Sequence, residues 1–297
     1  MHAVAPDLRP RVLFLDEQFV PPSQGIPAWD RGLLFGDGVF ETLRGSKDGC
    51  FRLDAHLARL ACGQQVLGIE PPKAIGRLPS ILAEAVDRAG ALPTYLRITV
   101  TRGDNEMGLA TRGLGPSRLL VWAQALPSSV TLPPRLLLAK IRRPGPSAGP
   151  THIKTCNYLP QILAKREAEA EGYDDALMMN DAGALVCATA ANVFVFHGST
   201  LRTPALADGC LPGVTRAAVI EAAHAQGMPC VETQLHASDL ETADAVLLCN
   251  ALRGLVPAAL VRVQPAEAPH TLFVDHPPAV ALQQALAAKV ERERKPW

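Results

Sequence analysis

The sequence is poor in lysine, which narrows the chemistry that its cations can perform. Of its 29 basic residues only seven are lysines, at positions 47, 73, 140, 154, 165, 289 and 295, and the others are arginines. An arginine stays protonated, whereas a lysine amine can lose its proton and act as a nucleophile. Any amine chemistry therefore belongs to a short set of positions.

A charge surplus and long apolar runs are also lacking. The 29 basic side chains balance 29 acidic ones, whereas nucleic acids and anionic membrane surfaces favour a basic excess. No segment approaches the roughly 18 uncharged apolar residues of a membrane span. Residues 1–15 are broken by prolines and arginines and do not resemble a signal peptide. We therefore expect no nucleic-acid or membrane partner.

Paired cysteine and histidine patterns are absent as well. The seven cysteines are widely spaced without a C-x-x-C pair, and the eight histidines form no H-x-x-x-H pair. This pattern is typical of reduced thiols and differs from a disulfide framework or a zinc site. We expect a cytoplasmic protein that holds no metal.

A length of 297 residues predicts about two domains. The strongest linker candidate is residues 125–134 (ALPSSVTLPP), because it contains three prolines and two serines. It predicts an N-terminal α/β domain over residues 1–124 and a C-terminal domain over residues 135–297. Apolar spacing and terminal glycines predict an α+β fold with helices at residues 55–67 (capped by Asp54), 78–89, 158–171, 214–226 and 278–292.

Lys154 differs from the other lysines in its surroundings. It lies between Ile153 and Thr155, just before Asn157, which can cap the helix predicted over residues 158–171. Partial burial would lower the pKa of such a lysine and leave a neutral amine able to form a Schiff base. A solvated surface charge is the alternative.

A second feature predicts a phosphate site. Gly213, Val214 and Thr215 open a predicted helix after a proline, and free backbone N–H groups at a helix N-terminus bind phosphate. Arg59 could complete such a site with a bidentate contact. An ordinary helix cap and a surface arginine are the alternatives. A lysine for an imine and a cup for one phosphate together describe pyridoxal 5′-phosphate.

Seven short motifs follow one another between residues 11 and 260. They are residues 30–44 (DRGLLFGDGVFETLR), 56–60 (HLARL), 153–159 (IKTCNYL), 172–177 (GYDDAL), 190–194 (AANVF), 211–216 (LPGVTR) and 249–257 (CNALRGLVP). In this order they resemble the fold-type IV pyridoxal-phosphate enzymes, the class IV aminotransferase family. That family includes branched-chain and D-amino-acid aminotransferases and 4-amino-4-deoxychorismate lyase.

The resemblance implies a smaller N-terminal α/β domain and a larger C-terminal domain with an antiparallel β core. It also implies pyridoxal 5′-phosphate as cofactor, and a homodimer with active sites near the subunit interface and between the domains. Lys154 would hold the cofactor as an imine and move the proton at the substrate Cα. The other implied contacts are Arg59, Val214 and Thr215 at the phosphate, Asn250 and Ala251 in a neighbouring loop, and Tyr158 near the phenolic oxygen.

One position departs from the family pattern. Five residues before Asn192 the family usually has a glutamate that keeps the pyridine nitrogen protonated, and this sequence has Cys187. No carboxylate occurs between Asp181 and Asp208 to replace it. A thiol donates only weakly and cannot hold a pyridinium as a carboxylate does. We expect a working but altered site; a tolerated substitution, a ring partner from elsewhere and a non-catalytic family member are the alternatives.

The altered ring position favours elimination over transamination. Residues 250–254 (NALRG) and 35–43 (FGDGVFETL) also resemble 4-amino-4-deoxychorismate lyase, which expels pyruvate and leaves 4-aminobenzoate, a folate precursor. Residues 102–109 (RGDNEMGL) are instead closer to the branched-chain aminotransferases. The lyase is the favoured function, and a branched-chain or D-amino-acid aminotransferase is the main alternative.

The predicted substrate contacts are three residues on one face of a strand and two arginines elsewhere in the chain. Side chains alternate along a strand, so Phe40, Thr42 and Arg44 share a face. Arg97, on a predicted strand, and Arg253, on a loop, could bind substrate carboxylates. A surface charge is the alternative for each arginine.

Overall fold

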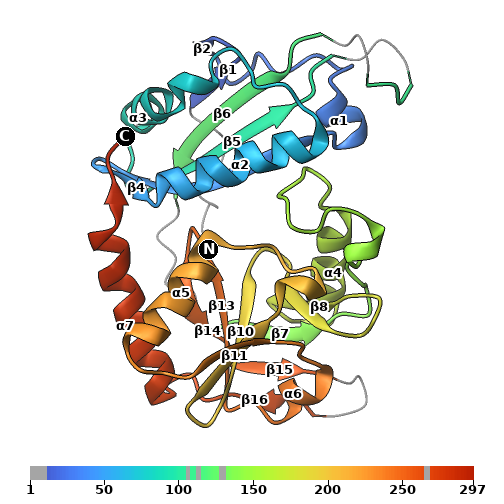
Figure 1. Ribbon diagram of the computed structural model, residues 1–297, viewed down its shortest axis with the longest axis vertical. Helices are drawn as coiled ribbons and strands as arrows, with labels where there is room; N and C mark the ends of the chain where they lie inside the picture. The colour runs from blue at the N-terminus through green and yellow to red at the C-terminus, as the bar shows by residue number, and fades with distance from the viewer. Residues whose placement is uncertain (1–11, 105–107, 112–114, 127–131, 264–267) are drawn as a thin grey trace, which may run out of the picture. The chain divides into compact units, whose positions relative to one another are not determined.

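A computed structural model describes residues 12–104, 108–111, 115–126, 132–263 and 268–297 (Figure 1). The chain forms two compact units. The first comprises Met1–Ser129, Ile153–Asn157 and Glu293–Trp297, and the second comprises Val130–His152 and Tyr158–Arg292. Two short segments from later in the sequence therefore complete the first unit, and one of them contains Lys154.

The first unit is built on a seven-stranded antiparallel sheet with the order β17-β4-β3-β5-β6-β1-β2. Two of its helices, α2 (Leu53–Leu67) and α3 (Leu78–Ala89), pack on one face of the sheet (Figure 1). The other elements are β1 (Val12–Leu15), β2 (Gln18–Val20), α1 (Arg31–Phe35), β3 (Gly38–Ser46), β4 (Gly49–Phe51), η1 (Ile75–Arg77), β5 (Thr94–Thr101), β6 (Arg118–Ala125) and β17 (Arg294–Lys295).

The two faces of this sheet carry different side chains. Leu96, Ile98 and Val100 of β5 are fully buried in the core formed with α2 and α3. Arg97 and Thr99 lie between them in sequence and therefore point to the opposite face. One face supplies the hydrophobic core, and the other presents polar and aromatic side chains.

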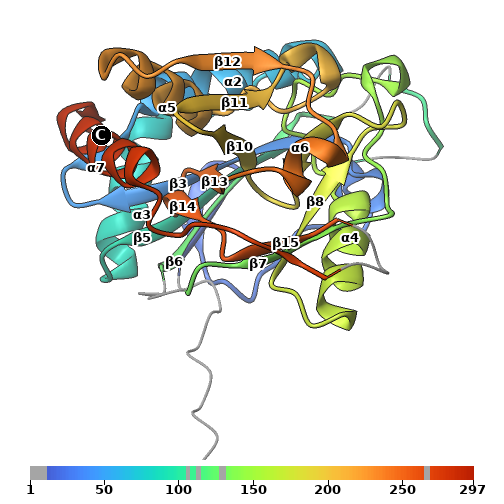
Figure 2. The ribbon, with the colours of Figure 1, turned by 90° about the horizontal axis from the view of Figure 1, so that it is seen from below.

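The second unit contains two five-stranded sheets, β12-β11-β10-β13-β14 and β16-β15-β7-β8-β9 (Figure 2). Apolar side chains of both sheets, among them Leu177, Val193 and Val246, share one core. Most neighbouring strands are antiparallel, and the pairs β11–β12, β7–β15 and β7–β8 are parallel.

The strands of the second unit are β7 (Arg135–Leu138), β8 (Asp175–Met179), β9 (Leu185–Ala188), β10 (Asn192–His197), β11 (Thr200–Pro204), β12 (Cys230–Thr233), β13 (Ala245–Asn250), β14 (Gly254–Pro257), β15 (Leu260–Arg262) and β16 (His270–Thr271). Its helices are η2 (Pro146–Ala148), α4 (Leu159–Ala170), η3 (Leu206–Asp208), α5 (Val214–Ala225), α6 (Ala237–Glu241) and α7 (Pro277–Arg292). Within the described residues, no helix has the length and apolar character needed to cross a bilayer.

The predicted α+β architecture is confirmed, and all five predicted helices are present. Asp54 was predicted as an N-cap, and this is wrong, because α2 begins at Leu53 with Arg52 at the N-cap position. Asp54 lies in the first turn, where its negative charge interacts favourably with the positive end of the helix dipole. Part of the predicted linker 125–134, residues 127–131, lies outside the described residues.

Candidate active site

Lys154 lies on a short extended segment that runs beside β3. The Phe40 N–H donates to the Lys154 carbonyl at 2.9 Å, and the Cys156 N–H donates to the Gly38 carbonyl at 2.9 Å. Ile153, 4% exposed, points away from solvent and lies close to α2, since a Cβ built at Gly63 would lie 3.8 Å from the Ile153 Cβ. The segment is therefore fixed to the sheet, and alternation directs Lys154 away from Ile153.

Asn157 anchors the end of this segment. It was predicted to cap the following helix, but its side-chain amide donates to the Gly36 carbonyl at 3.0 Å instead. Helix α4 begins at Leu159, with Tyr158 at the N-cap and no side-chain cap hydrogen bond. Gly36 has a left-handed φ of 67°, and a Cβ there would lie 2.5 Å from the side-chain oxygen Oδ1 of Asn157. Only glycine permits this approach.

The aromatic ring of Phe40 contacts two cationic side chains, those of Lys154 and Arg97. The Lys154 Nζ lies 4.4 Å from the centre of the Phe40 ring, and the Arg97 guanidinium carbon lies 3.7 Å from it. A ring face attracts such cations. Thr42 is the β-sheet partner of Arg97, so it shares the same face. The structure thus brings Lys154, Phe40, Thr42 and Arg97 together.

Arg44 lies at the edge of this group. It is paired with Tyr95, and its side chain is exposed. Arg97 is half-buried, and its Nε donates to the Thr99 hydroxyl at 3.3 Å. Of the two arginines on this face, Arg97 has the fixed geometry that carboxylate binding requires.

Arg59 is held on the core side of β3 by a carboxylate. Its Nε and Nη2 donate to Glu41 at 2.7 and 2.8 Å, and His56 Nδ1 lies 2.8 Å from Glu41 Oε2. Burial alone would raise the pKa of Glu41, but the hydrogen bonds from Arg59 and His56 outweigh it and lower the pKa to about 2. Glu41 is therefore a buried anion that fixes the Arg59 guanidinium.

Sequence reasoning did not single out Glu41 or His56. A signal exists for both: Glu41 occupies an inward position between Val39 and Leu43 on β3, where an apolar residue is expected. His56 and Arg59 are three residues apart on α2, so they lie on one helix face. A charged residue on an apolar strand face needs such partners.

The N-terminus of α5, in the second unit, has the features of an anion site. Gly213 is its N-cap residue, and no side chain caps the helix, which leaves backbone N–H groups for an anion. A Cβ at Gly213 would lie 2.1 Å from Asn192 Oδ1, so only glycine fits. Arg216, in the first turn and 4% exposed, has a buried Nε without a partner among the described residues. Val214 and Thr215 are both buried at this helix end.

Asn250 closes a tight turn between β13 and β14. Its Oδ1 accepts hydrogen bonds from the Leu252 and Arg253 N–H groups at 3.1 and 2.9 Å, and its Nδ2 donates to the Ala190 carbonyl at 3.2 Å. Ala251 is half-buried in this turn, and Arg253 is exposed. The turn is therefore held in shape by its own asparagine.

Cys187 lies on β9 and is 4% exposed. Arg143 Nη1 donates to the Cys187 sulfur at 3.4 Å, and Arg143 Nη2 donates to the Thr151 carbonyl at 3.1 Å. No carboxylate contacts the Arg143 guanidinium in the part of the chain that the structure describes. Sequence reasoning missed Arg143, because 44 residues separate it from Cys187 and no local pattern joins them.

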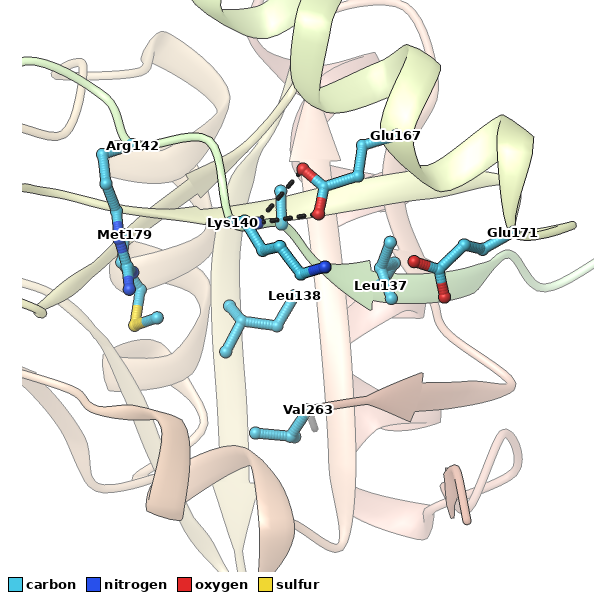
Figure 3. Close-up of a pocket in the computed structure, with 9 residues that line it drawn as sticks. Leu137, Leu138, Lys140, Arg142, Glu167, Glu171, Met179 and Val263 are labelled. Carbon is cyan, nitrogen blue, oxygen red and sulfur yellow. Dashed lines mark hydrogen bonds between the residues drawn. The ribbon is translucent and has the colours of Figure 1, made fainter. Parts of the chain in front are cut away.

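The predicted site residues belong to both compact units. Those of the first unit are Phe40, Thr42, Arg44, Arg59, Arg97 and Lys154, and those of the second are Tyr158, Cys187, Val214, Thr215, Asn250, Ala251 and Arg253. A cavity of about 120 Å³ in the second unit is lined by Leu138, Lys140, Glu167 and Met179 among others (Figure 3). None of the predicted site residues lines it, so this cavity is not the candidate site.

The chain is similar to known proteins in sequence and in fold. A family model described as amino-transferase class IV matches residues 38–261. A putative branched-chain-amino-acid aminotransferase of Methanocaldococcus jannaschii is 30% identical over 254 residues, which cover 82% of this chain and 86% of the relative.

Two solved structures show the same fold. A branched-chain aminotransferase from the thermophilic archaeon Thermoproteus uzoniensis, with norvaline, matches with a TM-score of 0.87 and 25% identity, over 97% of this chain and 99% of that one. A putative 4-amino-4-deoxychorismate lyase from Legionella pneumophila matches with a TM-score of 0.79 and 28% identity, over 89% and 95% of the two chains.

The family match covers most of the chain, and the motifs, the fold and the relatives agree with it. Class IV aminotransferases use pyridoxal phosphate, and a further branched-chain aminotransferase structure, at 25% identity, is complexed with N-(5′-phosphopyridoxyl)-L-glutamate. The cofactor expected from Lys154 and the helix N-terminus is thus confirmed. The chain therefore belongs to the class IV aminotransferase family and is a pyridoxal-phosphate-dependent enzyme, an aminotransferase or a lyase.

Proposed function

We propose that this enzyme is a 4-amino-4-deoxychorismate lyase, which releases pyruvate and forms 4-aminobenzoate for folate synthesis. The observation that carries the proposal is the thiol of Cys187 beside Arg143, in place of a carboxylate. Elimination driven by aromatisation requires less electron withdrawal by the cofactor than transamination does. The lyase matched above, 28% identical, supports the same choice.

The residues present fit a phosphate-bearing cofactor. The uncapped N-terminus of α5 and the close approach at Gly213 suit a phosphate group. In the proposal, the phosphate contacts are Val214, Thr215, Asn250, Ala251 and Arg59. Tyr158 contacts the phenolic oxygen, and Cys187 faces the pyridine nitrogen.

Lys154 is the proposed catalytic residue. Its amine would hold the cofactor, and as a base it would remove the proton from the substrate carbon that bears the amino group. The bound cofactor supplies a sink for the electron pair released at that carbon. The C–O bond to the enolpyruvyl group would then break with its electron pair on the oxygen, and the ring would become aromatic. The protonated Lys154 amine would give its proton to the departing enolpyruvate, which becomes pyruvate.

Substrate binding is assigned to the Phe40 face of the first unit. Arg97 binds a substrate carboxylate, because stacking on Phe40 and the bond to Thr99 fix its guanidinium. Phe40 and Thr42 line the same surface. Arg44 and Arg253 are proposed as outer carboxylate contacts, since both side chains are exposed.

An amino-acid aminotransferase is the second candidate, of branched-chain or D-amino-acid type. The relative at 30% identity, named a putative branched-chain-amino-acid aminotransferase, favours it. This function would use the same Lys154 amine and the same cofactor contacts, with Lys154 moving the proton taken from the substrate Cα, and its amino-acid substrate has no enolpyruvyl group to lose.

The product formed from 4-amino-4-deoxychorismate tests the proposal. The purified holoenzyme should release pyruvate and 4-aminobenzoate in equal amounts, and Lys154→Ala should abolish both products. Lys165→Ala, which changes a surface lysine on α4, is the matched control. Conversion to the pyridoxamine form with leucine or alanine, without pyruvate release from the chorismate substrate, would establish the aminotransferase instead.

We also propose a cytoplasmic homodimer. All seven cysteines are free, as expected for a reducing compartment. Leu159, Ile162 and Leu163 lie along α4 with 64, 54 and 37% of their surfaces exposed, a stripe suited to burial between subunits. Light scattering of the purified protein should give twice the chain mass, and a monomer would exclude this assembly.

A further inference from the structure

Arg143 provides the Cys187 sulfur with an immobilised donor. The guanidinium donates to the sulfur through Nη1 at 3.4 Å and to the Thr151 carbonyl through Nη2 at 3.1 Å. The Arg143 backbone is also fixed, because its N–H donates to the Met179 carbonyl at 2.9 Å. Both the position and the orientation of this cation are therefore determined by the fold of the second unit.

No carboxylate among the described residues contacts the Cys187 sulfur or the Arg143 guanidinium, whose hydrogen-bond partners are the sulfur and the Thr151 carbonyl. Cys210 shares the apolar cluster of Cys187, and burial raises the pKa of its thiol to about 11, so it is neutral at physiological pH. Asp208 is near Cys210; its Oδ1 accepts a hydrogen bond from the Gln234 amide at 3.2 Å, and its Oδ2 is buried without a hydrogen-bond partner among the described residues. The Cys187 sulfur therefore faces one cation, Arg143, and no contacting carboxylate among the described residues.

This arrangement decides which way the thiol proton points. A sulfur that accepts a hydrogen bond from a guanidinium directs its own S–H away from that cation, because the two positive hydrogens repel. The sulfur is then a donor to any acceptor on its other side. The pyridine nitrogen of the cofactor carries a lone pair and is such an acceptor.

We propose that Arg143 is a positioning residue that aims the Cys187 thiol as a donor at the pyridine nitrogen, and that this pair keeps the nitrogen unprotonated. The inference rests on the proposed function, in which Cys187 faces that nitrogen. A carboxylate would stabilise a pyridinium, whereas a guanidinium beside a thiol repels its positive charge.

Two spectroscopic measurements test the pair without any turnover. The holoenzyme is prepared with cofactor labelled with ¹⁵N in the ring, and its ¹⁵N chemical shift is recorded across neutral and mildly alkaline pH. We expect a pyridine-type shift that does not change with pH. The S–H stretch of Cys187, isolated as the difference from Cys187→Ser in the infrared spectrum, should move to lower wavenumber when the cofactor binds.

Variants separate a positioning role from a structural one. Cys187→Glu should give a pyridinium-type shift, because a carboxylate then faces the ring. Arg143→Leu should raise the protonated fraction of the nitrogen, and Arg143→Lys, which keeps the charge, should restore the wild-type shift. Arg142→Leu removes the exposed neighbouring cation and is the matched control, with no change expected.

A pyridinium-type shift in the wild-type holoenzyme would overturn the proposal, as would an S–H band that does not move on cofactor binding. An unchanged shift in Arg143→Leu would exclude the positioning role. These outcomes are distinct from failure of the proposed function, which is an absence of pyruvate release. An enzyme that transaminates can still show an unprotonated ring, and a lyase can still show a pyridinium.

Discussion

Two arginines near predicted cofactor contacts have different partners. Arg59, in the first unit, donates two hydrogen bonds to the carboxylate of Glu41, which is fully buried. Arg143, in the second unit, donates to the sulfur of Cys187 and to a backbone carbonyl. The first cation has a full negative charge beside it, and the second does not.

The difference separates a pair that stabilises the fold, Arg59–Glu41, from a pair proposed to set the protonation of the cofactor nitrogen, Arg143–Cys187. With the pKa of Glu41 lowered to about 2, the Arg59–Glu41 pair stays ionised at any physiological pH and holds β3 and α2 together. The guanidinium of Arg143 instead contacts a sulfur and a backbone carbonyl, so its positive charge can act on a group that faces Cys187. The fold thus pairs one arginine with a buried carboxylate and places the other beside a buried thiol.

The largest expected effect is that of Glu41→Gln on stability. The substitution leaves Arg59 and His56 in a buried site without their anion, and removing one partner of a buried ion pair costs about 3–5 kcal/mol. Urea unfolding measures the loss. Glu17→Gln is the control, because Glu17 and Lys73 form an exposed pair and about 0.5 kcal/mol is expected there. Equal effects of the two substitutions would remove the structural role of Glu41.

The free energy of unfolding at acid pH tests the Arg59–Glu41 pair. The pKa of Glu41 is lowered from 4.5 to about 2 on folding, so its contribution is complete above pH 4.5 and is lost as the pH falls through 2. The lost contribution is about 3 kcal/mol. Unfolding free energies measured across this range should show a steeper decline for the wild type than for Glu41→Gln. Parallel curves would contradict the lowered pKa.

Local sequence patterns account for the elements better than for these pairs. Helix α3 has the predicted bounds, because apolar spacing and Gly90 are local signals. Lys154 could be singled out because few lysines exist and its flanks are unusual. The bond from Asn157 to Gly36 spans 121 residues, and so replaced the predicted cap without any local signal. Arg143 and Cys187 meet only after β8 and β9 pair, so their contact is a property of the tertiary fold.

A smaller effect is expected from Arg59→Lys. Lysine keeps the charge but lacks the planar fork that contacts both Glu41 oxygens, so one charged hydrogen bond is lost, at about 1.5 kcal/mol. Affinity for the cofactor should fall about tenfold if Arg59 also binds the phosphate. Cofactor titration and urea unfolding measure the two effects separately. A loss of stability with unchanged affinity would show that Arg59 is structural only.

The smallest expected effect is that of Cys187→Ala, and its size reveals the charge of the sulfur. If the sulfur is a neutral thiol, alanine removes a weak acceptor, and Arg143 keeps its bond to the Thr151 carbonyl, so the cost is about 1 kcal/mol. If the sulfur were a thiolate, the substitution would remove the anion beside the half-buried Arg143, and the cost would rise toward the roughly 3–5 kcal/mol expected for Glu41→Gln. Urea unfolding of Cys187→Ala beside Cys187→Ser distinguishes the two cases, because serine keeps a neutral acceptor. A large loss of stability in both variants would show that Cys187 carries a negative charge beside its arginine, as Glu41 does. The pyridine nitrogen that it faces would then be a pyridinium.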